Sequence, residues 1–289
     1  MAAGTKTVLI TGASGDIGRA LVRRLDELGG WRVLAAVRSL DAGEELARGS
    51  TAVVPVKLDI CDDASVAAAR DDVAGRLDGR GLDALVNNAG VSADGPLELV
   101  SIEALRRQFD VNVIGQVAVT QAFLPELRRA RGRVINMGGA AGRLTVPMYG
   151  GLSASKAALD SLTNALRMEL KYQGVRVSYV EPGALGTDFF QRSAEVARRD
   201  GQTGSPESQR IYEKAIEASA KAIAGSRTSP VDAAVGAIVK ALSARRPAAR
   251  YIVGLDARLG LMFLPRFPAG VRDRVLMANL KLGRKTFDA

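Results

Sequence analysis

The sequence predicts a doubly wound α/β domain, in which a parallel sheet of about seven strands is covered by helices on both faces. Three observations predict this class. Short apolar runs alternate with amphipathic helical stretches along most of the chain. The first apolar run leads directly into a glycine-rich turn, and no internal repeat or low-complexity linker interrupts the series. We therefore expect residues 1–289 to form one domain.

The expected strands are apolar runs that are too short for helices and rich in Val, Ile and Leu. They are Thr7 to Ile10, Arg32 to Val37, Val53 to Leu58, Ala84 to Val86, Arg133 to Asn136, Val175 to Val180 and Tyr251 to Val253. The stretches between them carry helical periodicity. They are Ile17 to Leu28, Ala64 to Leu77, a long pair from Ile102 to Arg131, and Ser153 to Tyr172.

Residues 184–230 depart from this pattern, because Gly, Ser, Gln and charged residues surround one short helix near Ser208 to Ala224. Doubly wound sheets bind ligands outside the carboxyl ends of their strands, so we expect this segment to be a lid over the substrate. Residues 255–289 form a basic C-terminal extension.

Composition excludes several classes of protein. The chain has no histidine, which removes the commonest neutral-pH base and the commonest zinc ligand, and we predict no metal site. Cys61 is the only cysteine and is expected to be a buried apolar residue. No apolar run reaches the roughly 18 residues of a membrane span, so we expect a soluble, cytoplasmic protein.

The net charge of +9 is concentrated at the C-terminus, where residues 241–289 hold ten Arg or Lys against three Asp. No DNA-binding motif accompanies this charge, and we expect no nucleic-acid partner. A solvated tail is favoured over a weak contact with a membrane surface.

The first strand is followed by Thr11-Gly12-Ala13-Ser14-Gly15-Asp16-Ile17-Gly18 and then by a helix. This is the strand, turn and helix arrangement that binds a dinucleotide diphosphate. Gly12 permits the tight turn, and Gly18 lets the helix approach the strand. An ordinary glycine-containing turn is the alternative. Asp16 either places a carboxylate near the diphosphate or turns outward.

The second strand ends at Val37-Arg38-Ser39 and offers no acidic residue to accept the ribose hydroxyls of NAD. Arg38 presents a planar fork that suits a 2′-phosphate, and Ser39 is a further donor. The sequence therefore favours NADP(H), although Arg38 could also be a plain exposed arginine.

Further motifs follow in order: Leu58-Asp59-Ile60, Asn87-Asn88-Ala89-Gly90, Met148-Tyr149-Gly150-Gly151-Leu152-Ser153-Ala154-Ser155-Lys156, and Glu181-Pro182-Gly183-Ala184-Leu185-Gly186-Thr187. Together with the first turn they resemble the short-chain dehydrogenase/reductase family between Thr7 and Thr187, which implies a Rossmann-type fold. Residues 249–257 are similar to the subgroup that acts on retinoids and hydroxysteroids. The resemblance implies cofactor contacts at Asp59, Ile60, Asn88, Ala89, Gly90, Lys156, Pro182, Gly183 and Thr187.

Members of that family use an Asn, a Ser, a Tyr and a Lys for catalysis. Asn112 and Lys156 match the first and the last. The family spacing puts Gly139 at the serine position and Leu152 at the tyrosine position, so both hydroxyls are missing. Because a phenol beside a lysine ammonium supplies the proton in this chemistry, the usual mechanism is not expected here.

Tyr149 is the nearest phenol along the chain, seven residues before Lys156. Two helical turns separate the two positions, about 10 Å along the axis. Tyr149 is therefore expected to lie in the loop before the helix and to line the substrate mouth or pack in the core. Its use as a substitute acid is the less favoured alternative.

Three functions stay open. The first is an atypical NADP(H)-dependent oxidoreductase on an apolar alcohol or ketone. The second is a protein that binds NADP(H) without redox turnover and acts as a sensor or partner subunit. The third is a non-redox cyclase, isomerase or dehydratase on the same scaffold. The resemblance also implies a homodimer or homotetramer built on the helices around Asn112 and Lys156.

Overall fold

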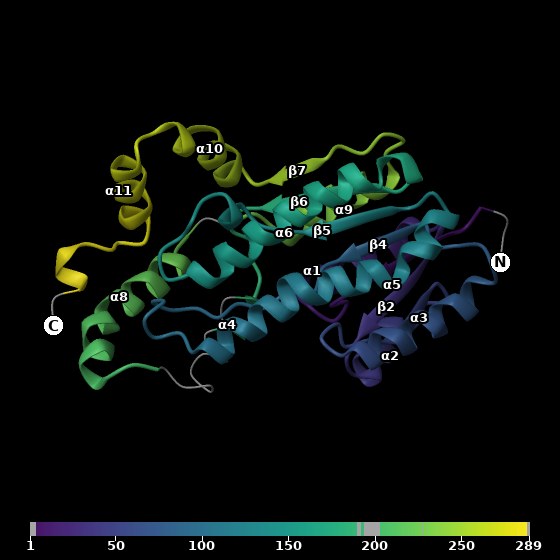
Figure 1. Ribbon diagram of the computed structural model, residues 1–289, viewed down its shortest axis with the longest axis horizontal. Helices are drawn as coiled ribbons and strands as arrows, with labels where there is room; N and C mark the ends of the chain where they lie inside the picture. Colours follow the sequence, from purple (N-terminus) through teal and green to yellow (C-terminus); the bar gives the residue numbers. More distant parts are fainter. Residues whose placement is uncertain (1–3, 190–191, 194–202, 227, 288–289) are drawn as a thin grey trace.

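The computed structural model describes residues 4–189, 192–193, 203–226 and 228–287, and it contains one parallel sheet of seven strands in the order β3-β2-β1-β4-β5-β6-β7 (Figure 1). This order confirms the predicted fold class. The strands are β1 (Lys6–Ile10), β2 (Trp31–Val37), β3 (Val53–Lys57), β4 (Ala84–Asn87), β5 (Arg133–Met137), β6 (Arg176–Pro182) and β7 (Arg250–Val253).

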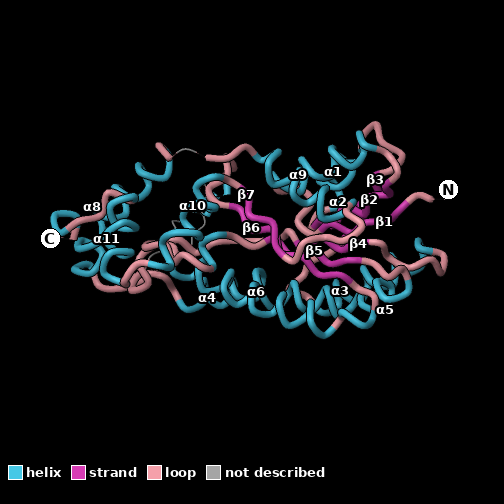
Figure 2. The backbone as a smooth tube through the Cα atoms, turned by 90° about the horizontal axis from the view of Figure 1, so that it is seen from above, coloured by secondary structure: helices cyan, strands magenta, loops and turns pink. Residues whose placement is uncertain are grey.

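Helices cover both faces of the sheet. The described helices are α1 (Asp16–Leu28), α2 (Leu40–Ala47), α3 (Asp63–Leu77), α4 (Ile102–Phe109), α5 (Gly115–Arg129), α6 (Gly150–Glu169), α8 (Pro206–Ala224), α9 (Val231–Ser243), α10 (Leu255–Phe263) and α11 (Ala269–Asn279). Figure 2 shows α1, α2 and α9 on one side of the strands and α3, α5 and α6 on the other.

The two layers follow from the alternation of side chains along each strand. Val8 and Ile10 of β1 belong to the core under α1 and α9, whereas Leu9 belongs to the core under α3 and α5. All three are fully buried. A parallel strand that is covered on both faces needs apolar residues at every position, and that need explains the continuous apolar runs in the sequence.

The element boundaries differ from the predicted ones in several places. Helix α6 begins at Gly150, three residues before the predicted start, and ends at Glu169 before a short 3₁₀ turn. The long helical pair is divided by a π-helical turn over Asp110–Ile114. Helices α2, α9, α10 and α11 are not predicted by the sequence pattern, although α9 is strongly apolar.

Cys61 was expected to be buried, and this expectation is wrong because the residue is exposed and free. It lies in the turn between Asp59 and α3, outside the sheet, where the thiol meets solvent. A lone cysteine has no pattern that distinguishes a loop position from a core position.

The segment that was predicted to form a lid over the substrate contains α8. This helix lies with α10 and α11 at the end of the sheet where the strands have their carboxyl ends (Figure 1). Ala215 of α8 is buried against Leu280 and Leu282, and Val146 and Met148 pack beside them. The C-terminal extension therefore covers α8 rather than leaving the body. Among the described helices, none is long and apolar enough to cross a membrane.

Candidate active site

The glycine-rich turn after β1 has the geometry that a diphosphate loop requires. Gly12 has a φ of +62°, and a Cβ there would lie 2.8 Å from the Cα of Ala89. A Cβ on Gly18 would lie 2.3 Å from the carbonyl oxygen of Gly12. Only glycine fits both positions, so the N-terminus of α1 can stand directly against the turn and offer its N–H groups to an anion.

The second cofactor motif locks this turn in place. The Asn88 amide donates to the carbonyl oxygens of Thr11 and Gly12, at 3.1 Å each. The Thr11 hydroxyl in turn accepts the backbone N–H groups of Asn88 and Ala89 at 3.0 and 3.1 Å. The Asn-Asn-Ala-Gly motif therefore stabilises the diphosphate turn from the neighbouring strand. Ser14 is exposed on the tip of that turn.

Asp16 turns toward the segment that follows β6. Its carboxylate accepts hydrogen bonds from the guanidinium of Arg192 at 2.7 Å and from the backbone N–H of Asp188 at 3.1 Å. The Arg192 hydrogen bond and charge hold the pKa of Asp16 below its usual value against the opposing effect of burial. The charge of Asp16 is therefore compensated by Arg192.

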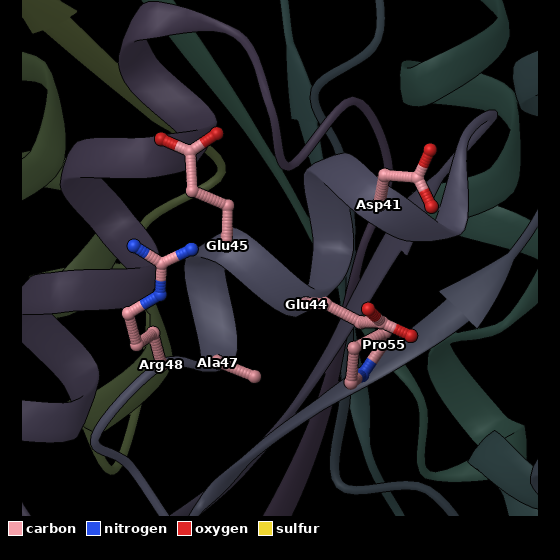
Figure 3. A pocket seen from close by; sticks show the side chains of 6 residues that line it. All are labelled: Asp41, Glu44, Glu45, Ala47, Arg48 and Pro55. Carbon is pink, nitrogen blue, oxygen red and sulfur yellow. The ribbon is translucent and has the colours of Figure 1, made fainter.

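Arg38 and Ser39 stand exposed at the carboxyl end of β2, where Ser39 is the N-cap of α2. The Asp59 carboxylate accepts the backbone N–H of Cys61 at 3.0 Å, and Ile60 is buried. A nearby surface hollow on α2 and β3 is lined by Asp41, Glu44, Glu45, Ala47, Arg48 and Pro55 (Figure 3). Its three carboxylates oppose a phosphate, so it is not an extension of the nucleotide site.

Asn112 lies in the π-helical turn between α4 and α5 and is fully buried. Its amide oxygen accepts the backbone N–H of Val91 at 2.9 Å, and its amide nitrogen donates to the Val91 carbonyl at 2.8 Å. The same nitrogen donates to the Ser155 hydroxyl at 3.0 Å. Asn112 therefore joins the loop after β4 to helix α6, and the widened helical turn gives it room to do so.

Lys156 projects from α6 toward the carboxyl end of β5. Its ammonium donates to the carbonyl oxygen of Met137 at 2.9 Å, and a Cβ on Gly90 would lie 3.7 Å from it. Burial lowers the pKa of Lys156 to about 8. The ammonium is thus still protonated at neutral pH, with donor capacity beyond the one described hydrogen bond.

The family resemblance predicts that Gly139 and Leu152 occupy the serine and tyrosine positions. A Cβ on Gly139 would stand 3.9 Å from Lys156 Cγ, which is ordinary contact distance, so a side chain fits there. Leu152 is 7% exposed and lies in the first turn of α6, one turn before Lys156. Neither residue can donate a proton.

Gly138, in contrast, has no room for a side chain. A Cβ there would lie 1.9 Å from Cζ of Tyr179, whose ring fills the space. The Tyr179 hydroxyl donates to the carbonyl oxygen of Lys156 at 3.0 Å and accepts the N–H of Gly139. Burial raises the pKa of Tyr179, so its phenol stays neutral and joins the turn after β5 to α6.

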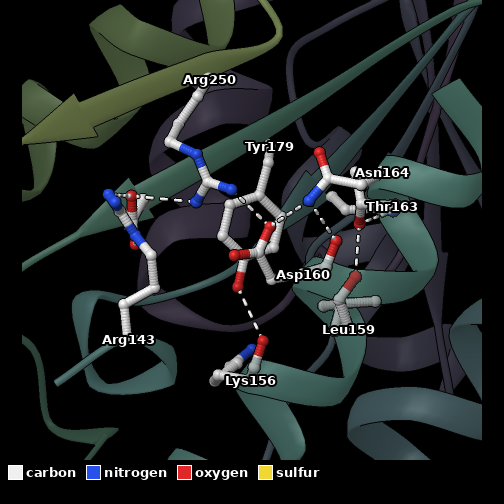
Figure 4. A network of polar contacts seen from close by, with 10 residues as sticks. Arg143, Lys156, Leu159, Asp160, Thr163, Asn164, Tyr179 and Arg250 are labelled. Atoms are coloured by element: carbon white, nitrogen blue, oxygen red, sulfur yellow. Dashed lines mark hydrogen bonds and ion pairs between the residues drawn. The ribbon is translucent and has the colours of Figure 1, made fainter.

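A partly buried ionic network continues from Tyr179 (Figure 4). Arg143 binds Glu181 through two hydrogen bonds, of 2.7 and 2.5 Å. Arg250 binds Glu181 at 3.1 Å and Asp160 at 2.5 Å, and its guanidinium lies 4.9 Å from the Tyr179 ring centroid. The network connects the loop that carries Gly139 to α6, β6 and β7, and thus fixes the floor beneath Lys156.

The residues after β6 are positioned by the start of α10. The Gly183 N–H donates to the Val253 carbonyl at 2.9 Å, and the Ala184 N–H donates to Asp256 at 3.0 Å. A Cβ on Gly183 would meet the Asp256 carboxylate at 2.2 Å. Pro182 ends β6, and the Thr187 hydroxyl accepts the Phe189 N–H at 3.4 Å, so this predicted cofactor segment lies at the same sheet edge as Lys156.

Tyr149 is the residue immediately before α6, as expected, and its side chain is buried. Burial and the nearby charge of Asp94 raise the pKa of its phenol. Tyr149 is therefore a buried, neutral side chain at the N-terminus of α6. Asp94 is partly buried and accepts a hydrogen bond from the Ser92 hydroxyl, a pairing that the sequence pattern did not indicate.

Comparisons with known proteins agree with this geometry. Residues 6–197 match the family described as short chain dehydrogenase. The chain belongs to this family. It is 35% identical over 257 residues to 3-amino-tetrahydro-pyrrolizinone reductase of Xenorhabdus hominickii, covering 88% of each sequence. It is also 35% identical over 284 residues to retinol dehydrogenase 16 of Homo sapiens, covering 94% of this chain and 87% of that protein.

A solved structure gives the same result for the fold. The short chain dehydrogenase of Burkholderia cenocepacia, determined in complex with NADP, superimposes with a TM-score of 0.71 at 28% identity and covers 98% of this chain and all of its own. This oxidoreductase family therefore contains relatives similar to the present chain over nearly its whole length.

Proposed function

We propose that this short chain dehydrogenase is an NADP(H)-dependent oxidoreductase that acts on an apolar alcohol or ketone. The observation that carries the proposal is the buried ammonium of Lys156, which stands beside Gly90 at the end of the predicted dinucleotide-binding frame. A buried cation with donor capacity to spare is costly unless a ligand uses it.

The residues present fit the cofactor. The N-terminus of α1 would hold the diphosphate, Arg38 and Ser39 would hold a 2′-phosphate, and Lys156 would donate to the nicotinamide ribose hydroxyls. When bound, the nicotinamide supplies or accepts a hydride. The Burkholderia cenocepacia relative was crystallised with NADP. The exposed Arg38 favours NADP(H) over NAD(H) in the present chain as well.

The substrate side is apolar. Leu144 and Leu152 are buried, and Val146 and Met148 pack under α8 and the C-terminal segment. The two relatives are named as a dehydrogenase of retinol and a reductase of an amino-tetrahydro-pyrrolizinone. An apolar alcohol or carbonyl compound of this kind is therefore the substrate class we propose.

A binding protein without redox turnover is the second candidate. It is favoured by one observation, namely that Gly139 and Leu152 place no proton donor at the predicted serine and tyrosine positions. Losing a positioned acid removes about 10²–10⁴ in rate. Such a protein would bind NADP(H) with the frame described above and signal through α8 or a partner chain.

The two candidates separate in one experiment. NADPH and NADH binding are measured by nucleotide fluorescence, and turnover is then measured against 2-decanone, benzil and all-trans-retinal. The proteins are the parent, Gly139→Ser/Leu152→Tyr, and Glu103→Gln as an exposed control. Turnover by the parent supports the oxidoreductase. Turnover by the double variant alone supports the binding protein, and failure to bind either nucleotide overturns both.

We further propose a cytoplasmic homo-oligomer built on the helices around Asn112 and Lys156. Ile114 of the π-helical turn and Leu162 and Met168 of α6 expose apolar side chains, as a helix interface requires. The apolar side chains and arginines on α10 and α11 would permit a weak contact with an anionic membrane surface.

A further inference from the structure

The exposed apolar side chains of this protein gather on α10, α11 and the turn between them. Seven of the fifteen large apolar side chains that are exposed in the described part of the chain lie between residues 255 and 275. They make up a C-terminal apolar surface, namely Leu255, Leu259, Met262, Phe263, Phe267, Val271 and Val275, with exposed fractions from 38% to 70%. Figure 1 shows α10 and α11 at the end of the molecule opposite to the N-terminus. A concentration of this kind marks an interaction surface.

Helix α10 has one buried and one exposed apolar face. Its exposed apolar residues follow the spacing i, i+4, i+7 and i+8, which places them within about 100° of one another around the helix axis. The opposite face carries Ala257 and Leu261, which are buried. They pack against Ala140 and Leu144, in the turn that follows Gly139. The inner face therefore attaches α10 to the body of the protein, and the outer face is available to a partner.

Helix α11 has less support from the body of the protein. None of its 11 residues is buried, although Met277 packs against the cluster that contains Leu280 and Leu282. A helix of this length is marginal in water unless one of its faces is covered. Val271 and Val275 form an exposed apolar stripe along it, one turn apart. A second surface that covers this stripe would stabilise α11.

Basic side chains border the C-terminal apolar surface. Residues 255–287 hold seven Arg or Lys against two Asp. Six of the seven are exposed, namely Arg258, Arg266, Arg274, Lys281, Arg284 and Lys285. On α11, Arg272 and Arg274 stand on the two sides of the valine stripe, each about 60° from the nearer valine around the axis. Apolar side chains bordered by Lys and Arg are typical of a helix that lies in a membrane interface, where the cations reach the lipid phosphates.

The charge of the surface favours one kind of partner. A second copy of this chain would bring the same exposed cations to the contact, in a protein with a net charge of +9. Like charges at such a contact oppose association. An anionic lipid surface offers phosphates above an apolar layer, so it can pair the cations and cover the apolar side chains at the same time.

We propose that α10, residues 264–268 and α11 form a docking surface for an anionic membrane. The seven apolar side chains insert into the lipid, and the exposed Arg and Lys bind lipid phosphates. This surface gives a location to the weak membrane contact proposed above. Because the inner face of α10 packs on the turn after Gly139, docking would hold the candidate active site one helix away from lipid that dissolves apolar compounds. That benefit for an apolar substrate rests on the proposed oxidoreductase function, whereas docking itself does not.

The first test measures binding of the full chain to vesicles, without nucleotide or substrate. Sedimentation is compared between vesicles of phosphatidylcholine alone and vesicles of phosphatidylcholine and phosphatidylglycerol in equal parts. We expect at least about tenfold stronger partition to the anionic vesicles, because their negative surface potential attracts the exposed cations, and added salt should weaken this preference. Absence of binding to both kinds of vesicle, or equal binding to the two, would overturn the proposal.

The second test assigns the contact to the apolar surface. Leu259→Ser/Phe263→Ser removes two exposed apolar side chains from the outer face of α10. Leu28→Ser/Leu40→Ser is the matched control, since its side chains are exposed to a similar extent on α1 and α2. We expect partition of the α10 variant to anionic vesicles to fall about 10–100-fold and that of the control to stay at the parent value. Equal partition of the two double variants contradicts the assignment and the proposal with it.

The third test concerns the cations. Arg266→Gln/Arg274→Gln should lose about tenfold in partition to anionic vesicles and nothing on phosphatidylcholine alone. Arg23→Gln/Arg48→Gln lowers the net charge equally on exposed residues of α1 and the end of α2, and it should stay near the parent. An equal loss in both variants would mean that net charge alone attracts the protein, and the docking surface would be rejected.

A tryptophan reporter and a mass measurement separate lipid from a second copy. Trp31 is the only tryptophan of the chain and is buried in β2, so brominated lipid should quench the fluorescence of Phe263→Trp and leave that of Leu40→Trp unchanged. Equal quenching of the two reporters contradicts the proposal. Light scattering without vesicles gives the oligomeric mass. If Leu259→Ser/Phe263→Ser breaks an oligomer that the control variant keeps, the surface is an interface between copies and the membrane proposal is overturned.

Discussion

The cofactor half and the substrate half of this molecule hold their sites by different means. Around β1 and β4 the geometry is set by the backbone, with Gly12 and Gly18 in positions that exclude a Cβ and Asn88 binding the turn through carbonyl oxygens. Around β5 and β6 it is set by side chains, since Tyr179 and the Arg143–Glu181 pair hold the loop that carries Gly139. The chemistry can therefore change in the second half without loss of the nucleotide frame in the first.

The neighbouring glycines after β5 provide the largest expected effect. Gly138→Ala puts a Cβ into the Tyr179 ring, whereas Gly139→Ala meets nothing closer than 3.9 Å. Overpacking of this kind costs about 3 kcal/mol and lowers the Tm by about 6–12 °C for a protein of this size. We expect Gly139→Ala to stay within about 2 °C of the parent, as measured by calorimetry.

The difference in Tm between the two glycine variants tests whether side-chain packing fixes the substrate half. When Tyr179→Leu is added to Gly138→Ala, the double variant should recover part of the lost Tm, because the shorter side chain vacates the ring position. Equal midpoints for the two glycine variants would show that Tyr179 can move aside and that the loop is not held as described.

The diphosphate turn provides the second effect. Gly18→Ala puts a Cβ 2.3 Å from the Gly12 carbonyl oxygen, whereas Gly15→Ala puts one at 3.4 Å with a φ of −75° that any residue adopts. We expect NADPH to bind about 10–100-fold more weakly to Gly18→Ala, since the helix must move away from the turn. Gly15→Ala serves as the matched control in the same fluorescence titration.

If Gly18→Ala binds NADPH as tightly as Gly15→Ala, the nucleotide does not depend on the close approach of α1 to β1. The cofactor half would then tolerate change as the substrate half does, and the contrast between the two halves would disappear.

The contrast also explains what the sequence could predict. The glycine spacing and the apolar runs are local patterns, and they predict the sheet, the first turn and the place of Lys156. The ionic network joins Arg143, Asp160, Glu181 and Arg250, and its directly bonded partners are separated by as many as 90 residues. No local pattern relates such residues, so their pairing could not be predicted.

Asp16 illustrates the same limit within the cofactor half. Its place at the start of α1 is clear from the sequence, but its direction depends on Arg192, 176 residues away. The sequence left two orientations open for that reason. The start of α6 was placed late because Gly150 and Gly151 are poor helix formers. A Cβ on Gly151 would lie 2.8 Å from the side-chain oxygen of Gln108, so the close approach of the two elements favours glycine there despite its low helix propensity.

The smallest expected effect concerns the choice between the two nucleotides. Arg38 is exposed at the end of β2, with Ser39 beside it, so its contact with a 2′-phosphate would be partly screened by solvent. Arg38→Asp should weaken NADPH binding about tenfold and strengthen NADH binding, because a carboxylate repels the phosphate and accepts hydrogen bonds from the ribose hydroxyls.

Arg48→Asp, at the other end of α2, makes the same change of charge away from the strand end. It should leave the ratio of the NADPH and NADH dissociation constants near the parent value. A ratio that does not respond to Arg38→Asp would mean that the 2′-phosphate is read by side chains outside β2, and that nucleotide choice, like the ionic network, belongs to contacts between distant parts of the chain.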